Sequence, residues 1–198
     1  MLHLRILDFL LTRNLSTDFY LVGVFSINML SAHNGIISTP SEIGKLITLG
    51  DLDLAYNDIT SLPSEIGMLT SLSRVDLGRN NFTSLQSEIG MWTSLTYLSL
   101  TSLYLCTNNI ASLPSEIRML TSLVDLYLFE NSITSLPSEI RMLTSLTSLA
   151  LYDNSITSLP GEIGMLTSLY LCKQLDDGRM IYFMLLVLRH ISFEYSRL

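Results

Sequence analysis

Leucine and other apolar residues recur along this chain in a pattern that repeats about every 23 residues. Each repeat contains an asparagine, and these stand at steps of 23, 28, 23 and 23 residues: Asn57, Asn80, Asn108, Asn131 and Asn154. The spacing LxxLxL precedes each asparagine, an apolar residue follows two positions later and a leucine five positions later. Five copies that agree at so many positions identify a repeat protein whose units pack on their neighbours.

The two halves of the repeat predict different elements. Alternate side chains of the LxxLxL segment point inward, which predicts a short strand, and stacked copies predict a parallel sheet. The asparagine lies where the chain leaves the strand, and its amide can bond backbone groups of its own and the adjacent turn. The Pro-Ser-Glu-Ile segment predicts a helical start, because proline is preset for a first helical turn and a helix N-terminus favours negative charge. These positions are Pro63, Pro114, Pro137 and Pro160, with Glu65, Glu88, Glu116, Glu139 and Glu162.

The consensus LxxLxLxxNxIxxLPxEIxxLxxL resembles the leucine-rich-repeat superfamily, and most closely its intracellular Ras-suppressor-like, plant Ras-group class. It extends over about residues 26–171. The resemblance implies an α/β fold, a curved horseshoe-shaped solenoid with a concave parallel β-sheet and short helical turns on the convex side. It is specific for the fold and says little about function.

Three segments are expected from this pattern. Residues 1–25 form an irregular N-terminal cap or degraded repeat, 26–171 a repeat domain of about six units, and 172–198 an apolar C-terminal cap or tail. The first unit is degraded and retains Met29, Asn34, Ile36, Pro40 and Ile43. The apolar run 180–188 is too short to span a membrane, which takes about 20 helical residues, so we expect a buried strand or helix that closes the solenoid.

The unit before Asn108 departs from the pattern. Gln86 replaces the proline, and Trp92 takes a leucine position, where we expect it to fill the core. A five-residue insertion near 95–100 allows two strand registers, starting at Leu95 or at Leu100. We favour Leu100, which restores the spacing to Asn108, and expect a bulge or looped-out segment at 95–100.

Charge and cysteine content exclude some partners and favour a location. The formal net charge is −7 and the pI is near 4.8, which argues against binding to nucleic acid or an anionic membrane. Cys106 and Cys172 are the only cysteines and lie three units apart, about 14 Å at the spacing of β-strands, too far for a disulfide. Secreted repeat domains often close their ends with several cysteines, and this chain has no such pairs, which favours a reducing, cytoplasmic location. The apolar stretch 19–30 follows two aspartates and therefore makes a poor signal peptide.

Candidate catalytic chemistry is sparse. The histidines, His3, His33 and His190, lie in the flanks without spaced metal ligands, and the glycines form no phosphate-binding loop. A Cys172–His190 pair would be the sole nucleophile and base, and we do not favour it. The repeated glutamates recur at the same position of each unit, about one repeat apart, which is typical of solvated residues at helix starts and not of a metal or acid–base site. We therefore expect no enzyme activity, cofactor or metal.

The outward-pointing residues of the strands and turns are the candidate partner-binding site. Aromatic and acidic side chains predominate there, with a small basic group, and protein-recognition surfaces are enriched in aromatic residues. We interpret the aromatic residues as anchors and the acids as selecting a partner with a basic surface. The alternative is that they are solvated strand residues. The candidates are Asp51, Asp53, Tyr56, Arg74, Asp76, Arg79, Tyr104, Asp125, Tyr127, Phe129, Glu130, Tyr152 and Asp153.

Methionine recurs at a convex position that the resembling family usually fills with a polar residue. We favour partial burial of these side chains against the neighbouring helical turn; an exposed ladder that allows weak self-association is the alternative. The residues are Met68, Met91, Met119, Met142 and Met165.

The function favoured by these patterns is non-catalytic protein binding on the concave face, with a signalling scaffold implied by the resemblance. The alternative is a secreted or membrane-anchored ligand-binding fragment of a larger leucine-rich-repeat receptor or receptor kinase. Two glycosylation sequons, at Asn14 and Asn81, are compatible with that alternative but are short enough to arise by chance.

Overall fold

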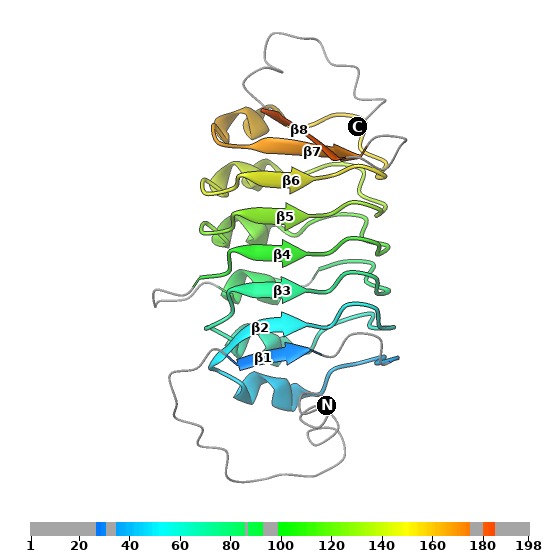
Figure 1. The fold of residues 1–198 in the computed structure, drawn as a ribbon, viewed down its shortest axis with the longest axis vertical. Helices are drawn as coiled ribbons and strands as arrows, with labels where there is room; N and C mark the ends of the chain where they lie inside the picture. The colour runs from blue at the N-terminus through cyan, green and yellow to red at the C-terminus, as the bar shows by residue number, and fades with distance from the viewer. Residues whose placement is uncertain (1–26, 31–34, 86, 93–98, 175–179, 185–198) are drawn as a thin grey trace.

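The computed structural model of the 198-residue chain describes residues 27–30, 35–85, 87–92, 99–174 and 180–184. Strands and five-residue 3-10 helices alternate along these residues (Figure 1). The strands are β1 (Ile27–Leu30), β2 (Leu49–Asp53), β3 (Arg74–Asp76), β4 (Ser102–Tyr104), β5 (Asp125–Tyr127), β6 (Ser148–Ala150), β7 (Tyr170–Gln174) and β8 (Met180–Met184). The helices are η1 (Ser41–Lys45), η2 (Ser64–Met68), η3 (Ser87–Met91), η4 (Ser115–Met119), η5 (Ser138–Met142) and η6 (Gly161–Met165).

The strands of the described residues form a single eight-stranded sheet in chain order. Strands β1 to β7 are parallel, and β8 runs antiparallel against β7 (Figure 1). Part of the apolar run 180–188 is thus a strand at the C-terminal end of the sheet, one of the two elements expected there. The expected solenoid, a parallel sheet with short helical turns on the opposite side, is confirmed.

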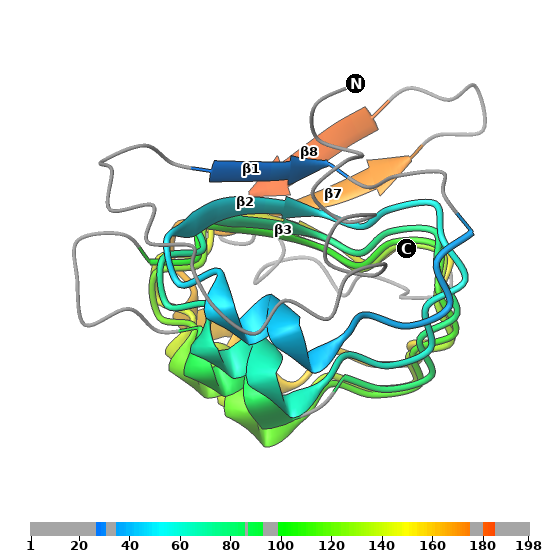
Figure 2. The same cartoon turned by 90° about the horizontal axis from the view of Figure 1, so that it is seen from below.

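The hydrophobic core fills the space between the sheet and the row of 3-10 helices, which lie on opposite sides of the solenoid (Figure 2). The inward residues of successive strands, such as Leu52, Val75 and Leu103, have no exposed surface. One inward residue per strand and one isoleucine per helical turn, such as Ile66, repeat this arrangement from unit to unit. Burial of these stacked apolar residues is the main contribution to stability, because each unit packs its apolar surface against the next one and so removes it from water.

The repeated asparagines join adjacent turns, as expected. Asn80 Nδ2 donates to the carbonyl of Leu77 at 3.1 Å within its own turn and to that of Leu54 in the preceding unit at 2.9 Å. Asn80 Oδ1 accepts a hydrogen bond from the backbone N–H of Ile59 at 3.0 Å. Asn57, Asn108, Asn131 and Asn154 make corresponding bonds. The ladder satisfies backbone groups that would otherwise be buried without partners.

The helical turns differ from the expected form in one detail. The prolines lie just before the helices rather than in their first turn; Pro63, for example, is extended with φ −69° and ψ 153°. Each helix keeps i→i+3 hydrogen bonds and ends after five residues. The physical reason is that a 23-residue unit leaves room for about one tight turn before the chain must return to the next strand.

The insertion leaves the register of the strands intact. Ser102, Leu103 and Tyr104 pair with Arg74, Val75 and Asp76, which confirms the register that starts at Leu100. Trp92 fills the core as expected: it is 1% exposed, and its Nε1 donates to the carbonyl of Ile66 at 3.0 Å.

Several expectations fall outside the described residues. They concern the N-terminal cap at 1–25, the histidines His3, His33 and His190, Asn14, Asn34 and Gln86, the looped segment at 95–98, the side chains of Glu88 and Cys172, and the tail beyond residue 184.

Candidate functional site

The concave face is built from three columns of side chains, each column taking one residue from each unit from β2 to β6. The first column contains Asp51, Arg74, Ser102, Asp125 and Ser148, and the second Asp53, Asp76, Tyr104, Tyr127 and Ala150. The third, two residues beyond the second in each unit, contains Ala55, Gly78, Cys106, Phe129 and Tyr152. Parallel in-register pairing brings residues 23 or 28 positions apart in sequence side by side.

Aromatic rings in the second column stack across the strands. The rings of Tyr104 and Tyr127 are parallel within 2°, with centroids 4.9 Å apart. The guanidinium carbon of Arg74 lies 4.8 Å from the centroid of the Tyr104 ring. A cation and two rings therefore form one continuous stack, in which the separation of adjacent strands, about 4.8 Å, sets the distance between the groups.

A second aromatic pair lies in the third column and corrects one expectation. Phe129 and Tyr152 stack with centroids 4.6 Å apart, and Tyr152 packs with the buried Ala150. Tyr152 was expected to be exposed to a partner, but it is only 7% exposed. The small side chain of Ala150 allows the Tyr152 side chain to pack against it. Tyr127 and Phe129 remain half-buried, so they present ring surface held in place by their neighbours.

The acidic residues of the strands each accept a hydrogen bond from a neighbouring backbone or hydroxyl group. Asp53 Oδ1 accepts from the backbone N–H of Ala55, and Asp76 Oδ1 from that of Gly78, both at 3.0 Å. Ser73 Oγ donates to Asp51 and Ser102 Oγ to Asp125, both at 3.1 Å. These aspartates are half-buried, so their carboxylates are oriented before any partner arrives.

Asp76 lies among three charged or polar groups of this face and is largely buried. Arg74 Nη2 donates to Asp76 Oδ2 at 3.0 Å, and the Asp76 side chain is 18% exposed. Burial, and after it the like charge of Asp53, raise the pKa of Asp76, while the Gly78 N–H and Arg74 act in the opposite direction. Burial therefore disfavours the charged form of this carboxylate even with Arg74 beside it.

A row of turn residues borders the columns at the C-terminal ends of the strands. Its members share a left-handed backbone with φ between 53° and 56°, which is rare for residues other than glycine: Tyr56, Arg79, Thr107, Glu130 and Asp153. Arg79 lies over the ring of Tyr56 at 4.9 Å, and Thr107 Oγ1 donates to Glu130 Oε2 at 2.9 Å. Four of these residues were predicted site residues, and all four are exposed.

The structure adds residues to the candidate site that the sequence did not single out. Ser102, Ser148 and Cys106 occupy column positions equivalent to predicted ones, and Thr107 lies in the turn row. The same spacing from the repeated asparagines, applied to every residue at the column and turn-row positions and not only to the charged and aromatic ones, locates them. Cys106 is a free thiol, as expected, and burial, followed by the charge of Asp76, raises its pKa to about 11. It is therefore a protonated, weakly nucleophilic group at neutral pH.

The methionines on the convex side are packed on one side and open on the other. They are 43–64% exposed, and Met91 Sδ lies 2.9 Å from the position that a Cβ on Gly67 would occupy. The close approach to the neighbouring helical turn agrees only in part with the expected partial burial, because all five side chains are exposed and Met68, Met91 and Met165 are more than half exposed. An apolar stripe thus runs along the convex side.

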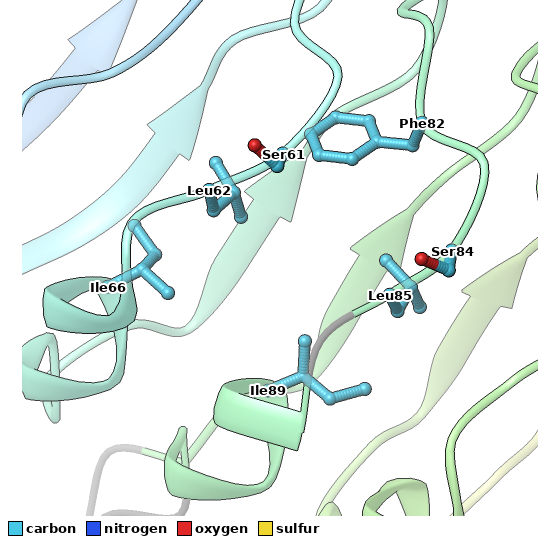
Figure 3. Close-up of a pocket in the computed structure, with 7 residues that line it drawn as sticks. All are labelled: Ser61, Leu62, Ile66, Phe82, Ser84, Leu85 and Ile89. Atoms are coloured by element: carbon cyan, nitrogen blue, oxygen red, sulfur yellow. The ribbon is translucent and has the colours of Figure 1, made fainter.

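The described residues offer little for small-molecule or metal chemistry. A shallow pocket lies between two adjacent units, where Leu62 and Ile66 face Phe82, Leu85 and Ile89, with Ser61 and Ser84 at its margin (Figure 3). It has about the space of one water molecule, too little for a cofactor. Within these residues no group of three or more His, Cys, Asp or Glu side chains is arranged to hold a metal ion. None of the described helices is long and apolar enough to cross a membrane.

Comparison with known proteins agrees with this architecture. Residues 98–156 match the leucine rich repeat family. A leucine-rich-repeat protein of Leptospira interrogans is similar in structure, with a TM-score of 0.61 and 34% identity, over 73% of this chain and 41% of that one. A comparison of the sequence with curated proteins gives no match.

Two plant receptors are also similar in structure. One is the ectodomain of the membrane receptor kinase GASSHO1/SCHENGEN3 from Arabidopsis thaliana, in complex with Casparian strip integrity factor 2, with a TM-score of 0.60 and 35% identity over 68% of this chain. The other is the plant peptide hormone receptor RGFR1 in complex with RGF2, with a TM-score of 0.59 and 30% identity over 68% of this chain. This chain covers 16% and 22% of those chains, respectively.

The repeat, the sheet and these likenesses make the chain a leucine-rich-repeat solenoid. It spans less than half the length of each of the three solved proteins. The fold is generally a non-catalytic interaction module, because stacking units produces an extended surface for a partner.

Proposed function

We propose that the chain is a non-catalytic protein-binding module whose partner lies on the concave face. The observation that carries the proposal is the pair of stacks Tyr104–Tyr127 and Phe129–Tyr152 beside oriented aspartates. Aromatic side chains held by their neighbours lose little conformational freedom on binding and supply large contact areas. Asp51, Asp53, Asp76 and Asp125 give the face an excess of negative charge, which favours a partner with a basic surface.

The similarity to receptors in complex with peptide or protein ligands supports binding of a polypeptide, although each receptor is much longer than this chain. We further propose that the module functions as an intracellular signalling scaffold of the Ras-suppressor-like class, located in the cytoplasm. The three-segment organisation, with a cap at 1–25, repeats at 26–171 and a tail at 172–198, belongs to the same proposal.

The second candidate is a ligand-binding part of a larger leucine-rich-repeat receptor or receptor kinase. The receptor likenesses and one sequon favour it: Asn81 is exposed, with its Nδ2 3.5 Å from Asp58 Oδ1, and Thr83 is exposed as well. Glycan occupancy at Asn81 in the native source, detected by mass spectrometry before and after glycosidase treatment, would favour the receptor. An unmodified Asn81 in cytosolic protein would favour the scaffold.

The exposed methionine ladder is proposed as a secondary, weak self-association surface. Unbranched thioether side chains adapt to many shapes, and five of them form one stripe. Substitution of Met91, Met119 and Met142 by Gln tests this by sedimentation velocity. A concentration-dependent shift that persists in the variant excludes the stripe as the contact.

The test of the main proposal is capture of partners from a host-cell extract by the wild-type chain and by the Tyr127→Ala, Phe129→Ala variant. A variant with Arg118→Ala and Arg141→Ala, both exposed on the convex side, is the matched control. Fluorescence of Trp92 verifies that all three proteins are folded, because Trp92 is the sole tryptophan and is buried.

We expect a protein that the wild type and the convex control retain and the concave variant loses. Charge reversal of Asp76, Asp125 and Asp153 to Lys should also abolish its capture if the partner is basic. Equal capture by all variants would place the interface outside the concave face.

A further inference from the structure

Arg74 occupies a place on the concave face that suits a guanidinium group. Its Nη2 donates to Asp76 Oδ2 at 3.0 Å, and its Cζ lies 4.8 Å from the centroid of the Tyr104 ring. A carboxylate in the plane of the guanidinium and an aromatic ring against its face are the two contacts for which arginine is better suited than lysine. Tyr127 supports the ring from the other side. The structure thus contains a guanidinium-binding position, and Arg74 is its occupant.

The charge around this position remains negative with Arg74 in place. The structure describes strands β2 to β6 in full. Their charged residues are one basic residue, Arg74, and four acidic residues, Asp51, Asp53, Asp76 and Asp125. Asp53 lies directly beside Asp76 in the parallel register, and like charges in that arrangement repel. One guanidinium therefore balances part of the acidic charge, and a second cation brought by a partner would be attracted to the same place.

Arg74 is held by contacts that are individually weak. The Arg74 side chain is 38% exposed, whereas that of Asp76 is 18% exposed, so water reaches the guanidinium and weakens its ion pair and its cation–π contact. Arginine also has a long, flexible side chain, so Arg74 can turn away into solvent without a change in the backbone. A competing guanidinium that is anchored by other contacts can displace it.

We propose that the partner of the concave face presents an arginine side chain, which takes the place of Arg74 between Asp76 and Tyr104. The proposal rests on the proposed function and specifies the chemistry of its ligand. Arg74 is an internal competitor: it occupies the site until a segment that also contacts Tyr127 and Phe129 arrives. A lone basic residue competes poorly with Arg74, which is tethered at the site by the chain, and this confers selectivity for a segment that makes both sets of contacts.

The experiment uses the full chain and vacates the site. N-acetyl-arginine methylamide is titrated into the wild type and the Arg74→Ser variant at constant ionic strength, and binding is followed by NMR chemical shifts. N-acetyl-lysine methylamide is the control for charge alone. We expect the Arg74→Ser variant to bind the arginine amide at least tenfold more tightly than the wild type does, and more tightly than it binds the lysine amide. The Arg74→Ser, Asp76→Asn double variant should lose this gain.

Equal affinity of the wild type and the Arg74→Ser variant would overturn the proposal, as would equal affinity for the arginine and lysine amides. Arg74→Gln, which keeps a polar side chain that is shorter and uncharged, is a second way to vacate the site, and Trp92 fluorescence reports folding of each variant. Failure here, together with loss of a captured protein in the Tyr127→Ala, Phe129→Ala variant, would leave the proposed function standing and reject only the arginine. Failure of both would reject the concave face.

Discussion

Thr39 is a residue at which the repeat pattern and the local chemistry disagree. It occupies the position that leucine fills in the later units, at Leu62, Leu85, Leu113, Leu136 and Leu159. It is 7% exposed, and its hydroxyl is buried without a hydrogen-bond partner in the described part of the chain. A buried hydroxyl that has lost its water and gained no partner lowers the stability of the fold.

The substitution Thr39→Val should therefore stabilise the protein. It removes the hydroxyl and keeps the shape, and we expect the free energy of unfolding to rise by about 1 kcal/mol. Urea unfolding followed by Trp92 fluorescence measures the change. Thr39→Ser, which keeps the hydroxyl and loses a methyl group, should instead destabilise the protein. A Val variant no more stable than the wild type would mean that the hydroxyl has a partner in solution.

Asp76 should make the stability of the protein depend measurably on pH. Burial raises its pKa above the ordinary value of 3.8, so the folded state favours the protonated carboxyl more than the unfolded chain does. Its contribution to stability is present in full below the unfolded pKa and is lost as the pH rises through the folded pKa. Asp76→Asn keeps an acceptor for the Gly78 N–H and removes the charge. The stability of this variant relative to wild type should therefore be greater at pH 7 than at about pH 3, which lies below the unfolded pKa.

Urea unfolding at both pH values, with wild type and variant measured in parallel, isolates Asp76 from the other carboxyl groups. The opposite trend, in which the variant loses stability relative to wild type as the pH rises, would show that the ion pair with Arg74 outweighs burial. That outcome would also mean that Arg74 is bound more firmly than the proposed displacement by a partner requires.

The sequence predicts which residues reach the concave face, but not how much each is exposed. Alternation along the strands correctly places Tyr104, Tyr127 and Phe129 in columns. It does not show that Tyr152 is buried, because that depends on the small side chain of Ala150 and on the stacked ring of Phe129. Nor does it show that Arg74 contacts Tyr104, which lies 30 positions further along the chain. Contacts between neighbouring columns depend on the register and on the rotamers of both partners.

At the scale of the element, the asparagine turns are the clearest link between a sequence motif and stability. Asn108 Oδ1 accepts from the N–H of Phe82 at 3.0 Å, and its Nδ2 donates to the carbonyls of Leu77 and Leu105 at 3.0 and 3.1 Å. The adjacent Asn109 is exposed. The pair therefore offers the same residue type in a buried and an exposed position of one turn.

Asn108→Ala should cost about 2–4 kcal/mol of unfolding free energy, because several buried backbone groups lose their partner at once. Asn109→Ala should change it by less than about 0.5 kcal/mol, as exposed substitutions usually do. The midpoints of urea unfolding of both variants provide the comparison. Similar small losses in both would mean that water replaces the Asn108 side chain in the turn, and the ladder would then contribute little to the stability of the stack.

Strand positions follow from the sequence with greater reliability than the form of the convex segments. The spacing to Asn108 is enough to choose Leu100 over Leu95, since a wrong register would move the inward leucines to the outer face. The convex segments were predictable only as short helical turns. Their 3-10 form, with Pro63 and Pro114 just outside the helix, depends on how much chain remains for the return to the next strand.

At the scale of the whole molecule, contacts connect each unit with its neighbours. The principal contacts among the described elements join consecutive strands and consecutive helices, such as β4 with β5 and η4 with η5. A solenoid of this kind has a stability that is nearly the sum of unit and interface contributions. The number of units can therefore change while the fold is retained, provided that the phase of the repeat is kept.

Deletion of residues 124–146, one complete 23-residue unit, should yield a shorter folded solenoid. Leu123 and Leu146 occupy equivalent buried positions in consecutive units. Joining Leu123 to Thr147 therefore keeps every buried leucine in line with its equivalents in the neighbouring units. We expect one cooperative urea transition with a smaller slope, because the slope follows the surface exposed on unfolding. Deletion of residues 124–134 alone breaks the phase, and that variant should not fold cooperatively. Loss of the transition in the full-unit deletion would contradict additive stacking.

The same full-unit deletion separates the fold from the proposed function. It removes Asp125, Tyr127 and Phe129, and brings the position of Tyr104 next to that of Ala150. The shortened protein should therefore keep its solenoid structure and lose the protein partner of the concave face. Arg74, Asp76 and Tyr104 are retained, so in the Arg74→Ser background it should still bind the arginine amide, although Tyr104 has lost the ring that stacks on it. Retention of the amide with loss of the protein partner would show that the guanidinium site and the aromatic anchors are separate parts of one binding surface.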